Sequence, residues 1–179
     1  MFEIEPTPLQ GLHLVRPTVR DDPRGWFMKL VHEPSFSTAG LVVHFPEQYA
    51  SMSIRGVLRG MHFQKPPHDH AKLVYCLSGR VLDVVVDLRR AGGSYGACFS
   101  KELDGEQKTG LYIPTGFAHG FLTLSEEAVL LYNVGTVHSP DHDTGVRWDS
   151  IGFDWPIRAP ITSDRDREFT TLDAFDSPF

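Results

Sequence analysis

Cysteine is scarce in this sequence. The two cysteines, Cys76 and Cys98, lie in strand-like runs and lack CxxC spacing. Nothing in this pattern indicates the disulfide framework of a small secreted protein. We therefore expect both side chains to be buried free thiols in a reducing compartment.

Long apolar runs and clusters of basic residues are also missing. No apolar stretch reaches the length of a membrane span, and the chain does not open with the regions of a signal peptide. These absences predict a cytoplasmic protein with no membrane partner. A net charge of −6 without a basic cluster argues against a nucleic-acid surface. It still leaves room for a small basic pocket that binds an anionic ligand.

No long segment keeps the 3.6-residue apolar period of a helix. Short β-branched runs between 13 prolines and 16 glycines favour an all-β protein instead. We expect strands at 12–19, 26–31, 42–45, 51–63, 72–77, 80–88, 97–102, 109–113, 120–124 and 128–137. Short helical turns are expected at 33–40 and in the tail after residue 155. This spacing predicts one domain over residues 1–179, a sandwich or barrel-like jelly roll.

Two local features sharpen that expectation. The runs 72–77 and 80–88 flank Ser78-Gly79, which predicts a hairpin. Val84-Val85-Val86 shows no alternation of apolar and polar residues. We therefore expect its strand to be covered on both faces, with a second subunit as one possible cover.

The run from Arg59 to Gln64 places basic and imidazole side chains in apolar strand sequence. A two-residue period puts His62 on the opposite face from Met61 and Phe63. Arg59, three residues before His62, faces the other side unless a bulge intervenes. Lys72 begins the next strand, as either an edge residue or an anion ligand. Taken alone, His62 is better explained as a hydrogen-bonded core histidine, and the nearby Arg59 and Lys72 are what favour a functional role.

A metal site is the main alternative use of the histidines. The pattern Pro114-x-Gly116-x-x-His119 resembles the second motif of the cupin superfamily, in which the histidine binds a metal. His68 and His70 supply a His-x-His pair, but no carboxylate follows at 71–75. Lys72 would also repel a divalent ion, and zinc or iron needs three or four well-placed ligands. We therefore expect no metal, and read the 65–70 segment as a solvated loop and 114–119 as a turn.

Tyr132 and Asp166 do not stand out by spacing. Tyr132 lies in a strand-like apolar run, where packing explains an aromatic residue. Asp166 follows Ser163 by three residues, as at the start of a capped helix.

The order of motifs along the chain is more specific. The chain resembles the dTDP-4-dehydrorhamnose 3,5-epimerase family of nucleotide-sugar epimerases from about Gly11 to Asp166. The matching motifs are Arg24-Gly25-Trp26-Phe27, Leu58-Arg59-Gly60-Met61-His62-Phe63, Lys72-Leu73-Val74, Val84-Val85-Val86-Asp87-Leu88-Arg89, Gly116-Phe117-Ala118-His119-Gly120-Phe121, Leu131-Tyr132, Ser139-Pro140 and Trp155-Pro156.

The resemblance implies a cupin-type jelly roll without metal or other cofactor, and a homodimer whose N-terminal strands join the partner's sheet. It also implies C3 and/or C5 epimerisation of a nucleotide-linked 4-keto-6-deoxy sugar. His62 would be the base, oriented by Asp166. Tyr132 would be the proton donor, and Lys72 would stabilise the enolate. Substrate contacts are expected from Arg24, Phe27, Lys29, Glu47, Tyr49, Arg59, Gln64 and His119.

The proposed chemistry is consistent with these residue types. Inverting a carbon beside a ketone requires a base, an acid on the other face and a cation at the developing oxyanion. Other readings are a 4-keto-sugar isomerase, a metal cupin that uses His68, His70 and His119, and a binding module without catalysis.

Several positions depart from the family pattern. Lys29 replaces a usual glutamate, Glu47-Gln48-Tyr49 replaces Gln-x-Asn, and Val137-His138 replaces an aromatic pair. Lysine has three donors and no acceptor, so Lys29 could not accept a hydrogen bond from thymine N3–H. One hypothesis is therefore that a CDP- or GDP-linked sugar is accepted at least as well as the dTDP-linked one.

Overall fold

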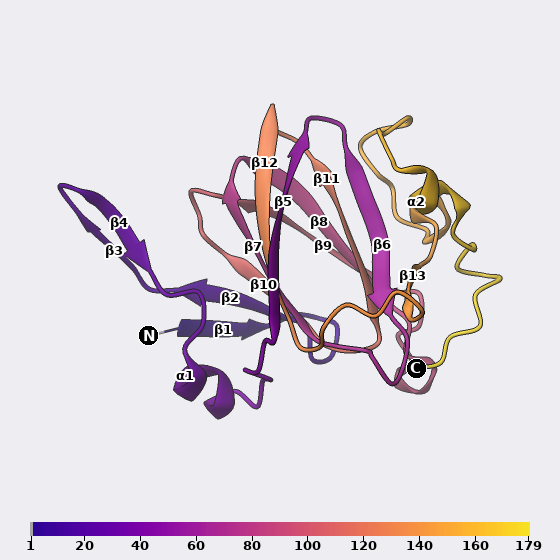
Figure 1. The fold of residues 1–179 in the computed structure, drawn as a ribbon, viewed down its shortest axis with the longest axis horizontal. Coiled ribbons are helices and arrows are strands. Elements are labelled where there is room, and N and C mark those ends of the chain that lie inside the picture. Colours follow the sequence, from indigo (N-terminus) through magenta and orange to yellow (C-terminus); the bar gives the residue numbers. More distant parts are fainter. Residues whose placement is uncertain (1) are drawn as a thin grey trace.

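Two antiparallel β-sheets dominate the computed structural model, which describes residues 2–179 (Figure 1). One sheet has the order β1 (Phe2–Pro6), β2 (His13–Pro17), β10 (Gly110–Ile113), β7 (Lys72–Ser78), β12 (Glu127–Val134) and β5 (Glu47–Ile54). The other has the order β13 (Asp143–Gly145), β6 (Leu58–Gln64), β11 (Phe117–Thr123), β8 (Arg80–Asp87) and β9 (Cys98–Asp104). The mostly-β sandwich predicted from the sequence is confirmed.

Three apolar layers hold the sheets in place. Val74, Val85, Phe121 and Leu130 belong to the core between the sheets. The outer face of the six-stranded sheet packs against the segment around α1 (Glu33–Thr38), where Phe36 is fully buried. The C-terminal residues cover the outer face of the five-stranded sheet. The site described below lies between the two sheets.

Strand β8 is covered on both faces, as its unbroken apolar run predicts. Val85 points into the core between the sheets, whereas Val84 and Val86 pack beneath residues such as Trp155 and Leu172. All three valines are fully buried. The suggested cover by a second subunit was wrong, because the chain's own C-terminal segment supplies it.

The hairpin expected about Ser78-Gly79 was also wrong. Strand β7 pairs with β10 and β12, whereas β8 pairs with β9 and β11, so the chain crosses between sheets at this corner. Gly79 has φ +75°, and a Cβ there would lie 2.1 Å from the Glu127 carbonyl oxygen. Both strands are apolar enough to enter different sheets, so sequence alone could not tell a corner from a hairpin.

The strand expected at 42–45 is absent. Leu41, Val43 and Phe45 pack against the outer face of the six-stranded sheet, whereas Val42 is exposed. Val42 N–H donates to the Tyr112 hydroxyl at 3.1 Å rather than to a neighbouring strand. The alternating pattern is therefore a packing pattern without strand pairing.

The expected helical turns and free cysteines are confirmed, whereas the expected turn at His119 is not. The helical turns appear as α1 and as α2 (Asp164–Glu168), and one-turn 3₁₀ helices lie at Arg90–Gly92 and Trp148–Ser150. Both cysteines are free thiols, Cys76 buried and Cys98 partly buried. His119 lies in β11 rather than in the expected turn. None of the helices in residues 2–179 is long and apolar enough to cross a membrane.

A small hairpin stands apart from the sandwich. Strands β3 (Val19–Asp22) and β4 (Gly25–Met28) pair only with each other and project from the body at the left of Figure 1. Trp26 and Phe27 on this hairpin are 51% and 60% exposed. Strand β5 forms one edge of its sheet, where Met52 and Ile54 are also exposed.

The apolar layer under the C-terminal segment gives a stability prediction. Trp155 is 8% exposed, lies edge-on to Phe153 and donates from Nε1 to the Trp148 carbonyl at 3.1 Å. Trp155→Ala should lower the free energy of unfolding by about 3–5 kcal/mol, because it leaves a cavity and an unpaired carbonyl. Urea unfolding measures this. Ile161→Ala, at a residue 56% exposed, should change stability by about 0.5 kcal/mol or less; equal losses in both variants would contradict the packing argument.

Candidate active site

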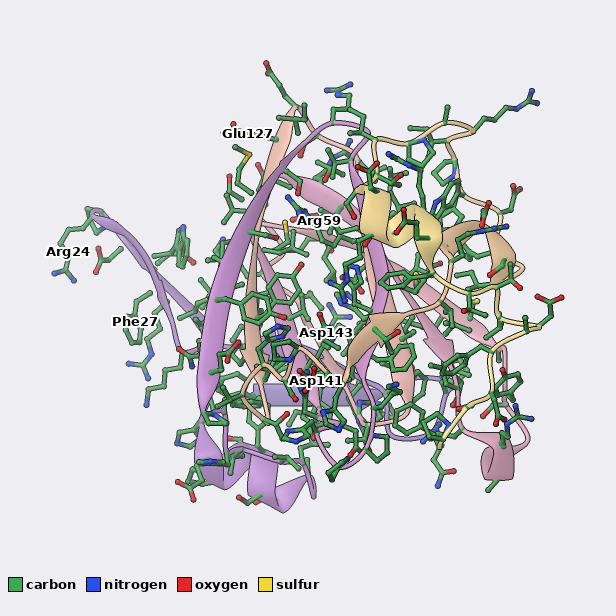
Figure 2. All side chains as sticks on the ribbon, turned by 45° about the vertical axis from the view of Figure 1, so that its right-hand side comes forward. Arg24, Phe27, Arg59, Glu127, Asp141 and Asp143 are labelled. Atoms are coloured by element: carbon green, nitrogen blue, oxygen red, sulfur yellow. The ribbon has the colours of Figure 1, made fainter. Side chains whose placement is uncertain are left out.

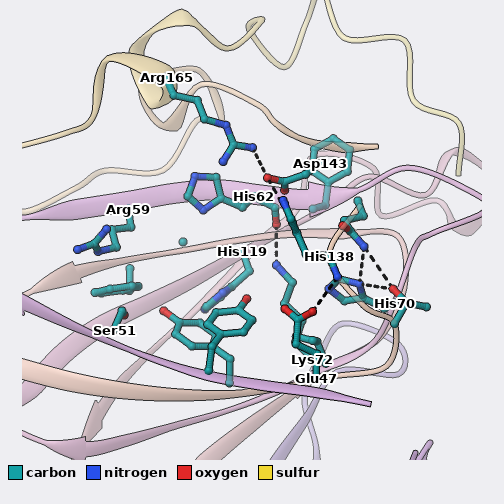
Figure 3. Close-up of a pocket in the computed structure, with 18 residues that line it drawn as sticks. Glu47, Ser51, Arg59, His62, His70, Lys72, His119, His138, Asp143 and Arg165 are labelled. Atoms are coloured by element: carbon teal, nitrogen blue, oxygen red, sulfur yellow. Dashed lines mark hydrogen bonds and ion pairs between the residues drawn. The ribbon is translucent and has the colours of Figure 1, made fainter. Parts of the chain in front are cut away.

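A cavity of about 360 Å³ opens between the two sheets (Figure 3). Eight of the twelve predicted site residues line it: Glu47, Tyr49, Arg59, His62, Gln64, Lys72, His119 and Tyr132. They come from β5, β7 and β12 of one sheet and from β6 and β11 of the other. A ligand in this cavity would therefore be contacted from both sheets.

His62 is held by a buried carboxylate from the C-terminal segment. Its Nε2 lies 2.8 Å from Asp166 Oδ1, and Asp166 is 3% exposed. Asp166 Oδ2 accepts a hydrogen bond from the Gly60 amide at 3.1 Å. Because an ionised carboxylate only accepts, neutral His62 keeps its proton on Nε2, and Nδ1 is the nitrogen able to take up a proton.

Asp166 stays ionised despite its burial. Desolvation alone would raise the pKa of this carboxyl, but hydrogen bonds from His62, Gly60 and Ser163 together hold the pKa below its usual value. Ser163 caps α2 by accepting a hydrogen bond from the Asp166 amide at 3.1 Å. The cap expected from the sequence thus also sets the place of the carboxylate.

An irregular register in β6 brings Arg59 and His62 to the same cavity. His62 pairs with His119 and Arg59 with Phe121, so three steps on β6 match two on β11. Gly60 makes this possible: its φ is +135°, and a Cβ there would lie 2.5 Å from Gly120 Cα. The bulge needed to bring Arg59 and His62 to the same side of the strand is therefore present. Met61 and Phe63 face the opposite apolar layer, as predicted.

Arg59 reaches across the cavity to the other sheet. Its guanidinium donates to Ser53 Oγ at 2.9 Å and to the Met52 carbonyl at 3.3 Å, both on β5. These contacts fix a positive charge at one side of the opening, where an anionic group could be bound.

Lys72 is the buried cation of the site, with 8% exposure. Its ammonium group donates to the His62 carbonyl oxygen at 3.1 Å (Figure 3). Burial lowers the pKa of Lys72 to about 8, and the negative charges of Asp143 and Asp83 oppose this shift. The group therefore carries its charge at neutral pH and loses it under mildly alkaline conditions.

Tyr132 faces the cavity from the sheet opposite His62. It is 7% exposed, and its ring lies edge-on to His119 with centroids 6.1 Å apart. Burial raises the pKa of the Tyr132 hydroxyl far above its usual value, so the group stays protonated at any ordinary pH. The cavity thus holds a candidate base on one wall and a neutral hydroxyl on the other.

Other predicted residues hold the walls. Gln64 is 4% exposed; its side-chain amide donates to the His68 carbonyl at 2.8 Å, and its oxygen accepts from the Ser139 amide at 2.6 Å. Glu47 accepts from the His138 amide at 2.9 Å. These two side chains fasten loops at the rim of the cavity.

Sequence reasoning missed three charged residues of the site. Asp83 is fully buried and accepts from His119 Nε2 at 2.8 Å. An aspartate inside the apolar run of β8 was the signal that could have identified it. Arg165 and Asp143 line the cavity and form an ion pair at 2.6 Å, and no spacing in the sequence links them.

The histidines of the metal alternative do not come together as ligands. His119 binds Asp83, His70 contacts Thr136 Oγ1 at 2.8 Å, and His68 packs against His142 instead of lining the cavity. Burial lowers the pKa of His70 to about 4, with the charge of Lys72 adding to this shift. Residues 2–179 contain no group of three or more His, Cys, Asp or Glu side chains placed to hold a metal ion.

Three predicted substrate contacts lie away from this cavity. Arg24 and Phe27 sit on the projecting hairpin, far from Arg59 in Figure 2. Arg24 is paired with Asp22 at 2.6 Å and is largely exposed. Phe27 and Lys29 line a separate hollow beside His32. None of these three residues lines the cavity that holds His62.

Comparison with known proteins assigns the family. The family described as dTDP-4-dehydrorhamnose 3,5-epimerase matches residues 6–174. A curated protein of that name from Methanothermobacter thermautotrophicus is 40% identical over 176 residues, covering 96% of this chain and 95% of its own. The chain therefore belongs to the dTDP-4-dehydrorhamnose 3,5-epimerase family, as its motifs indicated.

Solved structures agree. A dTDP-4-dehydrorhamnose 3,5-epimerase from Elizabethkingia anophelis superimposes with a TM-score of 0.91 at 39% identity, over 96% of this chain and 97% of the other. The dTDP-6-deoxy-D-glucose-3,5-epimerase of Legionella pneumophila, in complex with dTDP-4-keto-L-rhamnose, gives 0.93 at 30% identity, over 98% and 95%.

Proposed function

We propose that this protein epimerises a dTDP-linked 4-keto-6-deoxy sugar at C3, C5 or both, using only its own side chains as acid and base. The observation that carries the proposal is the placement of His62 with Asp166 on one wall of the cavity and Tyr132 on the other. Family membership supplies the substrate class, since the Legionella relative was solved with a dTDP-linked keto sugar.

The reaction follows from these positions. His62 Nδ1 takes the proton from the carbon beside the ketone, and the electrons of the C–H bond move into an enolate. Lys72 stabilises the negative charge on the enolate oxygen, in a buried place where such a charge interacts strongly. Tyr132 then donates its proton to the opposite face of the carbon, and solvent restores the protonation of both groups.

The charges around the opening suit a diphosphate. Arg59 and Arg165 both line the cavity, and guanidinium groups bind phosphate oxygens in a bidentate manner. Arg165 is held by Asp143 at 2.6 Å and lies over the Phe169 ring, so its position is defined before a ligand binds. The sugar would then point inward, toward His62 and Lys72.

The proposal includes a homodimeric cupin-type jelly roll. The hairpin β3–β4 exposes Trp26 and Phe27, and the unpaired edge of β5 exposes Met52 and Ile54. Exposed apolar residues at an open sheet edge favour association with another chain. We infer that the N-terminal segment packs on the partner's sheet and carries Arg24, Phe27 and Lys29 to the partner's cavity.

Labelling from solvent tests the catalytic roles. The enzyme is incubated in deuterium oxide with dTDP-, CDP- and GDP-linked 4-keto sugars, and NMR locates label and configuration. His62→Ala should lower exchange and inversion together by about 100-fold or more. Tyr132→Phe should lose inversion but keep exchange, since His62 can remove a proton and return deuterium to the same face.

The outcomes separate the alternatives. Inversion at the wild-type rate in His62→Ala would rule out this base, and a product with a moved keto group would indicate an isomerase. A preference for CDP- or GDP-linked substrate, lost in Lys29→Glu, would support the specificity hypothesis for Lys29.

The pH dependence of kcat/KM tests Lys72. Activity should fall as pH rises through about 8, because the lysine is protonated below its lowered pKa and neutral above it. Lys72→Arg should move the fall to higher pH, since a guanidinium stays charged. Asp143→Asn should move it to lower pH by removing a charge that favours the ammonium. A fall at the same pH in both variants would assign it to another group.

Sedimentation equilibrium tests the dimer. The wild-type protein should be dimeric at assay concentration, whereas Ile54→Asp, which places a charge on the exposed edge strand, should shift it toward monomer and reduce activity. Gln107→Asp, on a loop at the surface, serves as a charge control. A fully active monomer would contradict the assembly.

A further inference from the structure

The proton donor proposed above is packed against a second tyrosine. Tyr49 on β5 is the direct register partner of Tyr132 on β12. Their rings are stacked, with centroids 4.7 Å apart and planes 18° from parallel. Tyr132 is therefore held between Tyr49 on one side and the imidazole ring of His119 on another.

The two rings differ in their access to solvent. Tyr132 is 7% exposed, whereas Tyr49 is 43% exposed and lines the mouth of the same cavity. Tyr49 is thus the outer ring of the stack and shields the inner one. Its own side chain has no described hydrogen bond to His62, Lys72 or Asp166.

A stacked neighbour restricts what Tyr132 can do. The position of the Tyr132 phenol is set by rotation about its two side-chain torsions, χ1 and χ2. The parallel ring of Tyr49 against its face limits both rotations. His119, which bounds another side, is itself fixed by Asp83 at 2.8 Å. The Tyr132 hydroxyl is therefore confined to a narrow range of positions before substrate enters.

We propose that Tyr49 is a positioning residue for Tyr132, which sets how often the enolate is protonated on the face opposite His62. The inference rests on the proposed function, because it takes Tyr132 to be the donor.

The proposal predicts a change in how the enolate is divided between its two protonation routes, rather than a general loss of activity. Once the enolate forms, His62 can return a proton to the original face or Tyr132 can deliver one to the other. Loosening Tyr132 slows only the second route. The ratio of deuterium in recovered substrate to inverted product should therefore rise, while proton removal by His62 continues.

The experiment compares Tyr49→Ala, Tyr49→Phe and Gln48→Ala in deuterium oxide with the dTDP-linked 4-keto sugar. In Tyr49→Ala the ratio should rise about fivefold or more, within the ~100-fold that a misplacement of ~1 Å can cost. Tyr49→Phe keeps the ring and should restore the wild-type ratio. Gln48, the next residue on β5, is exposed and alternates to the other face, so its variant should leave the ratio unchanged.

Each outcome decides the matter. A parallel fall of exchange and inversion in Tyr49→Ala, or a raised KM at constant ratio, would overturn the proposal and make Tyr49 a substrate contact. Failure of Tyr49→Phe to restore the ratio would overturn it too, since the hydroxyl would then be what matters. If Tyr132→Phe keeps full inversion, Tyr132 is not the proton donor, and the proposed function fails at that point. If Tyr132→Phe loses inversion but Tyr49→Ala keeps the wild-type ratio, only the proposal for Tyr49 fails. Unfolding midpoints confirm that the variants are folded.

Discussion

The outer face of the five-stranded sheet is apolar and must be shielded from water. The segment that covers it also determines much of the geometry of the site. Val84, Val86 and Leu88 are fully buried because the C-terminal segment folds back over them with Trp155 and Leu172. That return path also carries α2 to β6 and places Asp166 beside His62. Packing of a hydrophobic face thus fixes the polar contact between His62 and Asp166, which lie more than a hundred residues apart in sequence.

The second constraint is the close approach of β6 and β11. Glycines at 60 and 120 allow the backbones to meet where side chains could not fit. The break in register turns Arg59 and His62 to one side and aims the Gly60 amide at Asp166. One local irregularity therefore supplies a cation, orients an imidazole and helps to keep a buried carboxylate ionised.

The cavity brings positively and negatively charged side chains close together. Lys72 is buried among Asp83, Asp143 and the His62 carbonyl, which keeps its ammonium form accessible at neutral pH despite desolvation. Asp83 and Asp166 each pair with a histidine, and these two histidines are direct register partners on adjacent strands. Buried carboxylates are costly unless they are hydrogen-bonded, and clusters of buried ionisable groups are typical of functional sites.

The sequence by itself determined the all-β class, the two short helices, the strand around His62 and the family. These depend on local patterns: turn residues, alternation and motifs of a few residues in a fixed order. It also identified eight residues of the cavity, since their motifs lie on separate strands. Only the tertiary structure decided that β7 and β8 enter different sheets, that residues 41–45 pack without pairing, and that Asp83, Asp143 and Arg165 join the site. The reason is physical: an apolar strand can be buried in either sheet, and a charge is stabilised by partners that the fold, not the chain order, brings within reach.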